Sequence, residues 1–338
     1  MQRRTFLKAL SAGMALSVLP LKAFAKNATV MKIGTSTIND SQHQWMINFA
    51  RIAESKAQGQ LKVEIFPASQ LGSTTRLIEQ TQMSTIQGVV APPEFLSGIN
   101  EAFSVLSAPG KFDGMEHIAR TLADQQLNNY LFSLGESKGL KGLGMFLSGP
   151  SAFCAREEIR TPEQFVGKKV RVLPAKIQQA QIKAMGGAPL PMPPSEVLPA
   201  LQQGTLDAVM SCIPVMESLS FSDGAKHFIE TNHGVISSMA AVSADWFSDL
   251  SKELQEIIVQ SGQEATASVR QFSIDDVNDA KSKWVKKGGN IITLTDSERD
   301  AFFTKLLPTG PAVVKENPDM EKAFTIYMQA IQRARNVT

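Results

Sequence analysis

The chain has 338 residues, 43% of them hydrophobic and 20% charged, a composition typical of a folded protein rather than a disordered one. At roughly 150 residues per domain, this length predicts about two domains. Lys and Arg total 34 and Asp and Glu total 32, so the formal net charge of +2 gives no electrostatic case for nucleic-acid binding.

The first 25 residues have the pattern of an export signal. Arg3, Arg4 and Lys8 precede an apolar run of about 13 residues, and residues 23–25 form a small-x-small cleavage site. The paired arginines followed by Phe-Leu-Lys resemble a twin-arginine (Tat) signal. A membrane anchor is the alternative, but the run is shorter than the roughly 20 residues that span a bilayer. We therefore expect export to the periplasm and cleavage after Ala25.

Cleavage would change the charge of the protein. The signal holds four basic residues and no acid, so the remaining 313 residues carry 30 basic and 32 acidic side chains, a formal net charge of −2. The excess of positive charge therefore belongs to the signal.

Short strands and helices alternate along most of the remaining sequence. Apolar–polar alternation and turn residues predict strands at 31–34, 61–66, 87–91, 140–147, 168–172, 206–210 and 291–294. Helical spacing predicts helices from 41 to before Gly59, at 74–83, 118–134 and 176–185, and from 195 to about 203. Thr161–Gln164 also has the pattern of a helix start. This alternation predicts an α/β fold with largely parallel sheets.

The last third of the chain departs from the alternation. Residues 252–287 contain no proline and keep a broad apolar stripe, which predicts one helix of roughly 50 Å that braces both domains. Gly288 and Gly289 end it, and Thr295–Glu298 fits a capping box for the next helix.

Signatures of the common enzyme classes do not occur in the sequence. It contains no G-x-S-x-G, H-E-x-x-H or Walker A motif. The histidines are not at metal-ligating spacing, so we expect surface or capping positions for them. Cys154 and Cys212 are too few for a disulfide-dense scaffold, and their spacing leaves pairing open; we expect free thiols. We predict no metal, no cofactor and no enzymatic activity.

Several segments resemble one family. Phe66–Gly72 is similar to the FPxxQLG segment, and Gly167–Val172 to the GxKxRV strand, of substrate-binding proteins of tripartite ATP-independent periplasmic (TRAP) transporters. Ala200–Gly204, Thr231–His233 and Trp246 follow in the same order. The resemblance implies a two-lobed periplasmic-binding-protein architecture with an interlobe cleft, crossing strands and a long helix. It places residues 26–149 and 237–276 in the first lobe and 150–236 and 277–338 in the second.

The same resemblance implies a function. The cleft would close over a small organic acid and deliver it to the membrane permease of a TRAP transporter. We expect the protein to act as a monomer. A secreted enzyme on the same scaffold, a sensory binding protein that presents its ligand to a receptor, and an interaction module without a ligand are the alternatives.

Arg171 is the leading candidate for binding the ligand carboxylate. The resemblance places it at the family's carboxylate-binding arginine, and a planar guanidinium that is always charged can bind a carboxylate bidentately. The alternative is a surface arginine on an alternating strand.

Departures from the family pattern suggest the remaining candidates. A second arginine of several relatives is replaced near Ser151, an asparagine near Ser211, and an aromatic residue by Pro194. These losses favour a monocarboxylate, with hydroxyl, keto or apolar groups, over a dicarboxylate. The further candidates, each with loop capping or core packing as the alternative, are Ser36, Thr37, Asp40, Pro92, Ser151, Phe153, Ser211, Cys212 and Ser238.

Overall fold

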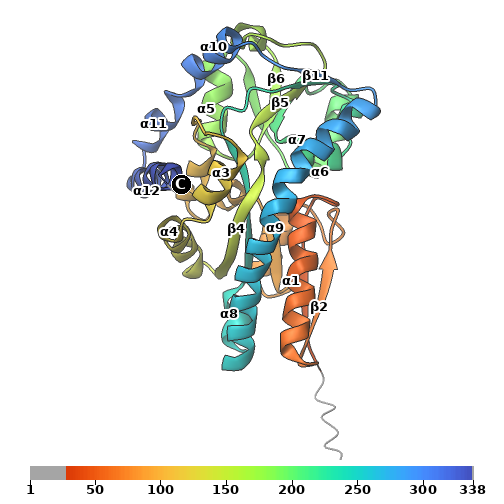
Figure 1. Ribbon diagram of the computed structural model, residues 1–338, viewed down its shortest axis with the longest axis vertical. Helices are drawn as coiled ribbons and strands as arrows, with labels where there is room; N and C mark the ends of the chain where they lie inside the picture. The colour runs from red at the N-terminus through yellow and green to blue at the C-terminus, as the bar shows by residue number, and fades with distance from the viewer. Residues whose placement is uncertain (1–27, 337–338) are drawn as a thin grey trace, which may run out of the picture.

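Two mixed sheets, one in each lobe, organise the computed structural model, which describes residues 28–336 (Figure 1). The first sheet has the order β2-β1-β3-β10-β4 and the second the order β11-β9-β5-β8-β6-β7. The predicted signal, residues 1–25, lies outside the described residues. The strands are β1 Thr29–Gly34, β2 Leu61–Phe66, β3 Gly88–Ala91, β4 Leu140–Pro150, β5 Ala152–Ala155, β6 Lys169–Val172, β7 Ala188–Pro191, β8 Ala208–Ser211, β9 His227–Ile229, β10 Val235–Ser243 and β11 Asn290–Ile292.

Helices cover both sheets. The α-helices are α1 Ser41–Ala57, α2 Thr74–Gln82, α3 Met115–Leu122, α4 Gln125–Glu136, α5 Lys176–Ala184, α6 Pro194–Gln202, α7 Ile213–Ser218, α8 Ala244–Ser248, α9 Lys252–Lys286, α10 Asp296–Leu306, α11 Thr309–Val314 and α12 Pro318–Arg335. Short 3₁₀ helices are η1 Pro93–Leu96, η2 Glu101–Ser107, η3 Pro162–Phe165 and η4 Phe221–Asp223. The α/β fold class and the two-lobed architecture predicted from the sequence are confirmed.

The prediction of largely parallel sheets is only partly right. β5 runs antiparallel to β8 and β9, and β10 runs antiparallel to β3 and β4. The physical reason is the connection between the lobes. The chain leaves the first sheet along β4 into β5 and returns along β9 into β10, so the outgoing and returning segments lie side by side in opposite directions.

Two local predictions also differ from the structure. The helix predicted over 118–134 is two helices, because Asp124 caps a new one by accepting a hydrogen bond from the backbone N–H of Leu127 at 2.9 Å. The helix start at Thr161 forms its capping box but continues only as the short η3. Gly167 follows it with φ of +75°, a left-handed conformation that suits glycine and turns the chain toward β6.

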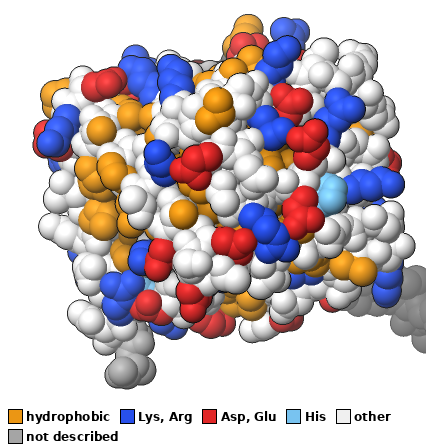
Figure 2. Space-filling view, turned by 90° about the horizontal axis from the view of Figure 1, so that it is seen from above, with side chains coloured by type: hydrophobic (Ala, Val, Ile, Leu, Met, Phe, Trp, Pro, Cys, Tyr) orange, Lys and Arg blue, Asp and Glu red, His pale blue; other side chains and the backbone are white. Residues whose placement is uncertain are grey.

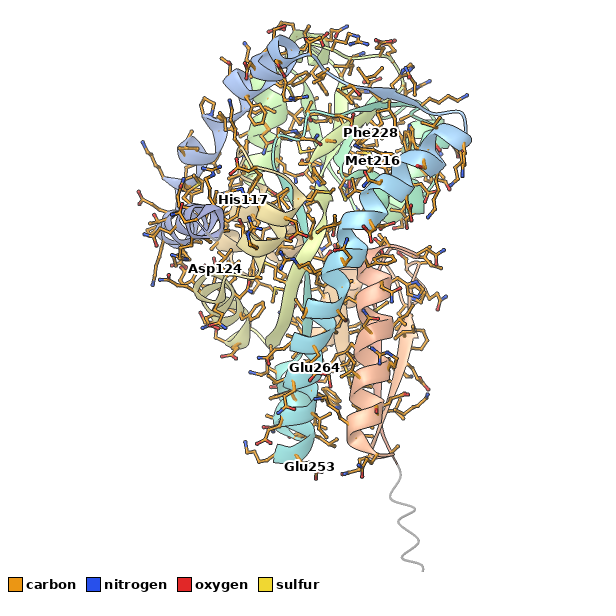
Figure 3. The ribbon with its side chains drawn as sticks, viewed as in Figure 1. His117, Asp124, Met216, Phe228, Glu253 and Glu264 are labelled. Carbon is orange, nitrogen blue, oxygen red and sulfur yellow. The ribbon has the colours of Figure 1, made fainter. Side chains whose placement is uncertain are left out.

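Helix α9 passes along both lobes, as predicted (Figure 1). Its first half packs on α1 and β4, and its second half on α7 and β11. Glu264, in the first half, pairs with Lys56 of α1 at 2.7 Å. In Figure 3, Glu253 and Glu264 lie along the lower part of α9, and Met216 and Phe228 of the second lobe lie near its upper part.

The final helix differs from the predicted lobe assignment. α12 packs on η2, α3 and α4, which surround the first sheet, whereas α10 and α11 pack on α5 of the second lobe. The sequence prediction placed all of 277–338 in the second lobe, and these contacts favour counting α12 with the first. None of the helices within residues 28–336 combines the length and hydropathy needed to cross a bilayer.

The lobes meet where the start of α1, the start of α7 and the middle of α9 come together. Asp40 is the N-cap of α1, and Cys212 is the N-cap of α7. Asp40 and Asp276 of α9 are both buried, and each has one carboxylate oxygen without a hydrogen-bond partner. Burial raises the pKa of Asp40 to about 6; burial and the nearby Asp40 raise that of Asp276 to about 7. Cys154 and Cys212 are free thiols, as expected.

The substitution Asp276→Asn should stabilise the protein at pH 8. The folded protein keeps a proton on Asp276 up to about pH 7, whereas an unfolded chain loses it near pH 3.8. The folded state therefore binds more protons in this window, and stability falls as pH rises through it. Asparagine has no proton to lose in this window, so the variant avoids this fall in stability. Its melting temperature at pH 8 should therefore be higher than that of wild type by on the order of 2 °C. The exposed neighbour Asp275→Asn is the control. Equal pH profiles of Tm for D276N and wild type would contradict this account.

The substitution Gly144→Ala should destabilise the first lobe. A Cβ on Gly144 of β4 would overlap the hydroxyl of Thr266 on α9, which accepts a hydrogen bond from Trp45 Nε1 at 2.9 Å. Forcing these elements apart should cost about 1–3 kcal/mol of unfolding free energy, measured by urea denaturation. Gly98→Ala is the matched control, because a Cβ there meets nothing within 4 Å. A G144A variant as stable as G98A would show that β4 and α9 are not closely packed.

Candidate functional site

A small cavity lies between the two lobes. Its volume is about 20 Å³, room for about one water molecule and far below the roughly 300–1,000 Å³ of ordinary ligand sites. Both lobes contribute side chains, so this is a closed arrangement that must open to admit a ligand. The residues that line it are Ser36, Thr37, Gln42, Thr74, Pro92, Arg171, Leu173, Pro194, Ser211, Val215 and Ile236.

Arg171 comes from the centre of strand β6. Its neighbours Val170 and Val172 fill the core of the second lobe, so strand alternation directs Arg171 to the opposite side, toward the cavity. The side chain is only 1% exposed, which excludes the surface-arginine alternative. Nε and Nη2 donate to the carbonyl oxygen of Met192 at 3.1 and 3.0 Å, and Nη1 to that of Met210 at 3.4 Å. Burial lowers the pKa of Arg171 to about 10, so the guanidinium is still charged at neutral pH.

A buried carboxyl group accompanies this cation. Glu94 of η1 is 0% exposed, and its Oε1 accepts a hydrogen bond from Ser107 Oγ at 2.7 Å. Its Oε2 has no hydrogen-bond partner. Burial raises the pKa of Glu94 to about 7, and the charge of Arg171 opposes the rise. The sequence analysis missed Glu94, although it lies three residues after the carboxyl end of the strand predicted at 87–91, in a region where α/β proteins commonly bind ligands.

Neutral polar groups make up most of the remaining polar lining. The hydroxyls of Ser36 and Thr74 lie 2.6 Å apart, and Gln42 accepts a hydrogen bond from Thr35 Oγ1 at 2.7 Å. The Thr37 hydroxyl is buried without a partner. The sequence analysis also missed Gln42 and Thr74, because their helices give no sign of which face meets the other lobe.

Five of the ten predicted residues line the cavity. Arg171 is one of them. The other four lie on loops or strand ends: Ser36, Thr37, Pro92 and Ser211. The other five do not, and each has different contacts. Asp40 and Cys212 lie at the lobe junction, and the hydroxyl of Ser238 lies 2.7 Å from that of Ser148 inside the first sheet.

Phe153 and Ser151 belong to the crossing between the lobes. The Phe153 ring packs between Phe165 and His233, with centroid distances of 4.8 and 5.0 Å. Ser151 Oγ lies 3.1 Å from Nε2 of His233. His233 is buried, and burial lowers its pKa to about 3. His117 is buried as well. The prediction of a surface or capping position is therefore wrong for His233, and for His117 a surface position is wrong.

Direct hydrogen bonds hold the lobes together on two sides of the cavity. On one side, Ser218 Oγ of α7 donates to the carbonyl of Ile38 at 2.7 Å and accepts from its N–H at 3.1 Å. On the other, Ser97 Oγ donates to the carbonyl of Pro174 at 2.6 Å, and Gln181 Nε2 to that of Ser107 at 2.8 Å. The closed form therefore needs no ligand to satisfy these groups.

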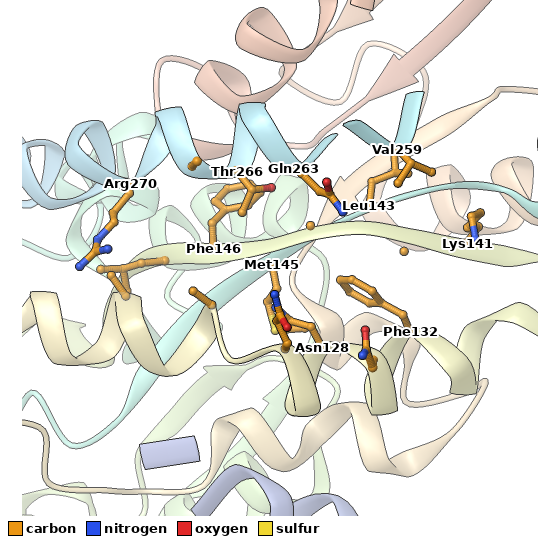
Figure 4. A pocket seen from close by; sticks show the side chains of 18 residues that line it. Asn128, Phe132, Lys141, Leu143, Met145, Phe146, Val259, Gln263, Thr266 and Arg270 are labelled. Carbon is orange, nitrogen blue, oxygen red and sulfur yellow. The ribbon is translucent and has the colours of Figure 1, made fainter. Parts of the chain in front are cut away.

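A larger groove, of about 750 Å³, lies on the first lobe between α4, β4 and α9 (Figure 4). Its cations, Lys141 and Arg270, are each paired with an acid, Glu136 and Glu116. No residue from the second sheet lines it, so opening and closing of the lobes would not enclose a molecule there.

Surface charge and metal-binding groups add no further site. Figure 2 shows basic and acidic side chains interspersed on the face turned to the viewer, with no broad region of one sign. Within residues 28–336, no group of three or more His, Cys, Asp or Glu side chains is placed to hold a metal ion.

Several known proteins are similar to this chain in sequence and in fold. The chain is 28% identical over 317 residues to the 2,3-diketo-L-gulonate-binding periplasmic protein of Escherichia coli (strain K12), covering 89% of this chain and 96% of the relative. It is 26% identical over 274 residues to the C4-dicarboxylate-binding periplasmic protein of Shewanella loihica, covering 80% of each. A TRAP periplasmic solute-binding protein from Desulfovibrio salexigens, solved with bound orotic acid, has a TM-score of 0.84 at 23% identity, covering 90% and 99% of the two chains.

The family itself follows from a match that covers most of the chain. Residues 34–316 match the model of the DctP family. This match includes both lobes, the crossing strands and the long helix, and it confirms the resemblance found in the sequence. The family consists of binding proteins rather than enzymes. The chain is therefore a member of family 7 of the bacterial extracellular solute-binding proteins, the periplasmic binding proteins of TRAP transporters.

Proposed function

We propose that the protein captures a small monocarboxylate bearing hydroxyl or keto groups by pairing its carboxylate with Arg171 in the interlobe cavity. One observation carries the proposal: within residues 28–336, Arg171 is the one Lys or Arg side chain that is fully buried, and it lines the cavity that both lobes enclose. A buried cation is costly unless a partner compensates it, and a carboxylate is the partner that its N–H groups fit best.

Binding depends on movement of the lobes. The cavity of about 20 Å³ cannot hold an organic acid, so the lobes separate, the acid reaches Arg171, and the lobes close again around it. In that complex a carboxylate takes over guanidinium N–H groups that now donate to the carbonyls of Met192 and Met210. A ligand that bridges both lobes favours the closed arrangement, because it contacts both lobes only when they are closed.

The chemistry of the lining supports one carboxylate rather than two. The lining offers one cation, and its other polar groups are the hydroxyls of Ser36, Thr37, Thr74 and Ser211 and the amide of Gln42. A second carboxylate would lack a buried counter-charge, whereas hydroxyl and keto groups match such neutral partners. Relatives are named for both classes: a hydroxylated diketo acid in one case and C4-dicarboxylates in another. The single arginine decides our choice between them.

We further infer how the protein reaches its place of work. The paired arginines and residues 23–25 support export to the periplasm by the Tat route with cleavage after Ala25. We expect the exported protein to be a monomer. Its partner would be the membrane permease of a TRAP transporter, to which the closed lobes deliver the acid.

The substitution Arg171→Met should abolish tight binding. Methionine keeps much of the apolar stem of the side chain but removes the charge, so the ligand carboxylate would enter a dry cavity without a partner. Such a loss costs about 3–5 kcal/mol, which corresponds to a rise in Kd of roughly two to three and a half orders of magnitude in calorimetry. Arg156→Ala, at an exposed arginine of the same lobe, should bind normally. Unchanged affinity of a folded R171M variant would reject Arg171 as the carboxylate partner.

The choice of ligand class can be tested with a panel of acids. D-glucuronate, orotate, succinate and L-malate would be compared by thermal shift and calorimetry, with D-glucose as the control that lacks a carboxylate. We expect at least one of the two monocarboxylates to bind tenfold or more tightly than either dicarboxylate, and glucose not to bind. A ligand at a hundredfold excess over its Kd adds about 2.7 kcal/mol of stability, enough for a clear shift. Preferential binding of succinate or malate would overturn the monocarboxylate proposal.

A further inference from the structure

Glu94 is a buried titratable group that the proposed capture mechanism does not yet use. It is 0% exposed, and although it does not line the cavity itself, it is close enough to Arg171 for the two charges to interact. One of its oxygens accepts a hydrogen bond from Ser107, and the other has no partner. A carboxylate with one unpaired oxygen is costly to keep ionised in such surroundings.

The environment of Glu94 changes when the lobes move. Ser107, its hydrogen-bond donor, accepts a hydrogen bond from Gln178 Nε2 of α5 at 3.2 Å, and Gln181 of the same helix donates to the Ser107 carbonyl. Gln178 also accepts from the backbone N–H of Leu173, next to the cavity, at 2.8 Å. A chain of buried polar groups thus runs from the cavity in the second lobe to Glu94 in the first. Closing the lobes completes this chain.

The titratable and charged groups around Glu94 are few. From β6 it faces Arg171, and from α12 it faces Tyr327, whose hydroxyl is buried without a partner. On α5 and η2, Lys176 pairs with Glu101 at the edge of the interface. The charged residues of α2, Arg76 and Glu79, are exposed, and β10 has no titratable side chain. Arg171 is therefore the cation that balances an ionised Glu94.

A bound anion would upset that balance. Arg171 can compensate one negative charge, but an ionised Glu94 together with a ligand carboxylate would bring two. Two carboxylates that share one dry site cannot both stay ionised without a large cost, and the proton goes to the one that is harder to solvate. The ligand carboxylate has direct access to the guanidinium, whereas Glu94 is already difficult to ionise.

We propose that Glu94 takes up a proton from solvent when the lobes close on an anionic ligand, and so couples capture to protonation. This inference rests on the proposed function. The proton adds to a carboxylate oxygen of Glu94 and forms an O–H group, which can donate a hydrogen bond within the closed cleft. The complex then holds one cation, Arg171, and one anion, the ligand, so the buried site is neutral. Glu94 thereby sets which total ligand charge the cleft accepts.

The sign of the pH effect follows from this scheme. The ligand anion, by taking up the charge of Arg171, raises the pKa of Glu94, which is already about 7 in the closed, empty form. The complex therefore holds more protons than the free protein, and affinity rises as pH falls. Above about pH 7, the Kd of a fully ionised acid should decrease as pH falls, by up to about tenfold per pH unit, the limit for one proton. It should level off below pH 7, where Glu94 is protonated in the free protein as well.

Calorimetry in buffers of different ionisation enthalpy measures the proton directly. Each monocarboxylate of the panel, with D-glucuronate first, would be titrated at pH 7.5 in phosphate and in Tris. We expect wild type to take up a fraction of one proton per bound acid. Glu94→Gln should bind without proton uptake and with a Kd independent of pH. Glu101→Gln, the matched control in the same interface, should keep the wild-type uptake.

A second variant tests the mechanism if E94Q folds poorly. The hydrogen bond from Ser107 favours the ionised form of Glu94, so Ser107→Ala should move the midpoint of the pH dependence to higher pH. Binding without proton uptake in wild type, or uptake retained in a folded E94Q, would overturn this inference and leave the proposed function intact. If none of the acids of the panel binds, both this inference and the proposed function are wrong.

Discussion

The closed structure depends on compensating one buried positive charge. Arg171 is held on β6, where the adjacent residues Val170 and Val172 fill a hydrophobic core and the guanidinium is buried on the other side. Carbonyl oxygens from two other segments, at Met192 and Met210, accept its hydrogen bonds. The partial negative charges of these oxygens reduce the free-energy cost of burying the guanidinium but do not remove it. This uncompensated charge supports the proposal that the site receives an anion, and in the empty cavity the charge of Arg171 acts on Glu94 instead.

The connections between the lobes determine how the cation can be reached. Paired strands cross in both directions, and α9 runs beside them, so the lobes cannot separate freely as they could on a single linker. Such a joint allows rotation of nearly rigid bodies and restricts other movements. Some of the hydrogen bonds that close the cleft lie at its rim, between Ser218 and Ile38 and between Ser97 and Pro174, and others are buried, from Gln178 and Gln181 to Ser107. Opening breaks these bonds, while each core stays packed.

Much of this architecture could be predicted from the sequence, because periodicity reports burial directly. The strand at 61–66 and the long helix were located almost to the residue, and the capping box at Thr295 forms as expected. The sequence analysis did not predict β5 and β10, which are buried along their whole length and so lack apolar–polar alternation, and without them the antiparallel pairings could not be predicted. The residues of the site also differ in whether the sequence could predict them. Arg171 follows from the family motif, whereas strand alternation alone allowed a surface position. Phe153, Ser151 and Ser238 are small or aromatic residues that serve equally well inside a lobe. Glu94 lay in a short 3₁₀ helix, where no periodicity shows which side is buried.

The small size of the empty cavity has a consequence for how well the protein competes for scarce solute. A closed, empty molecule offers no route to Arg171, so molecules in that state are temporarily withdrawn from the binding-competent pool. The measured dissociation constant is then the intrinsic one divided by the open fraction. Stronger rim contacts would thus weaken apparent affinity without touching the site. Selection on such a protein acts on the occupancy of the open state as much as on the contacts made to the solute.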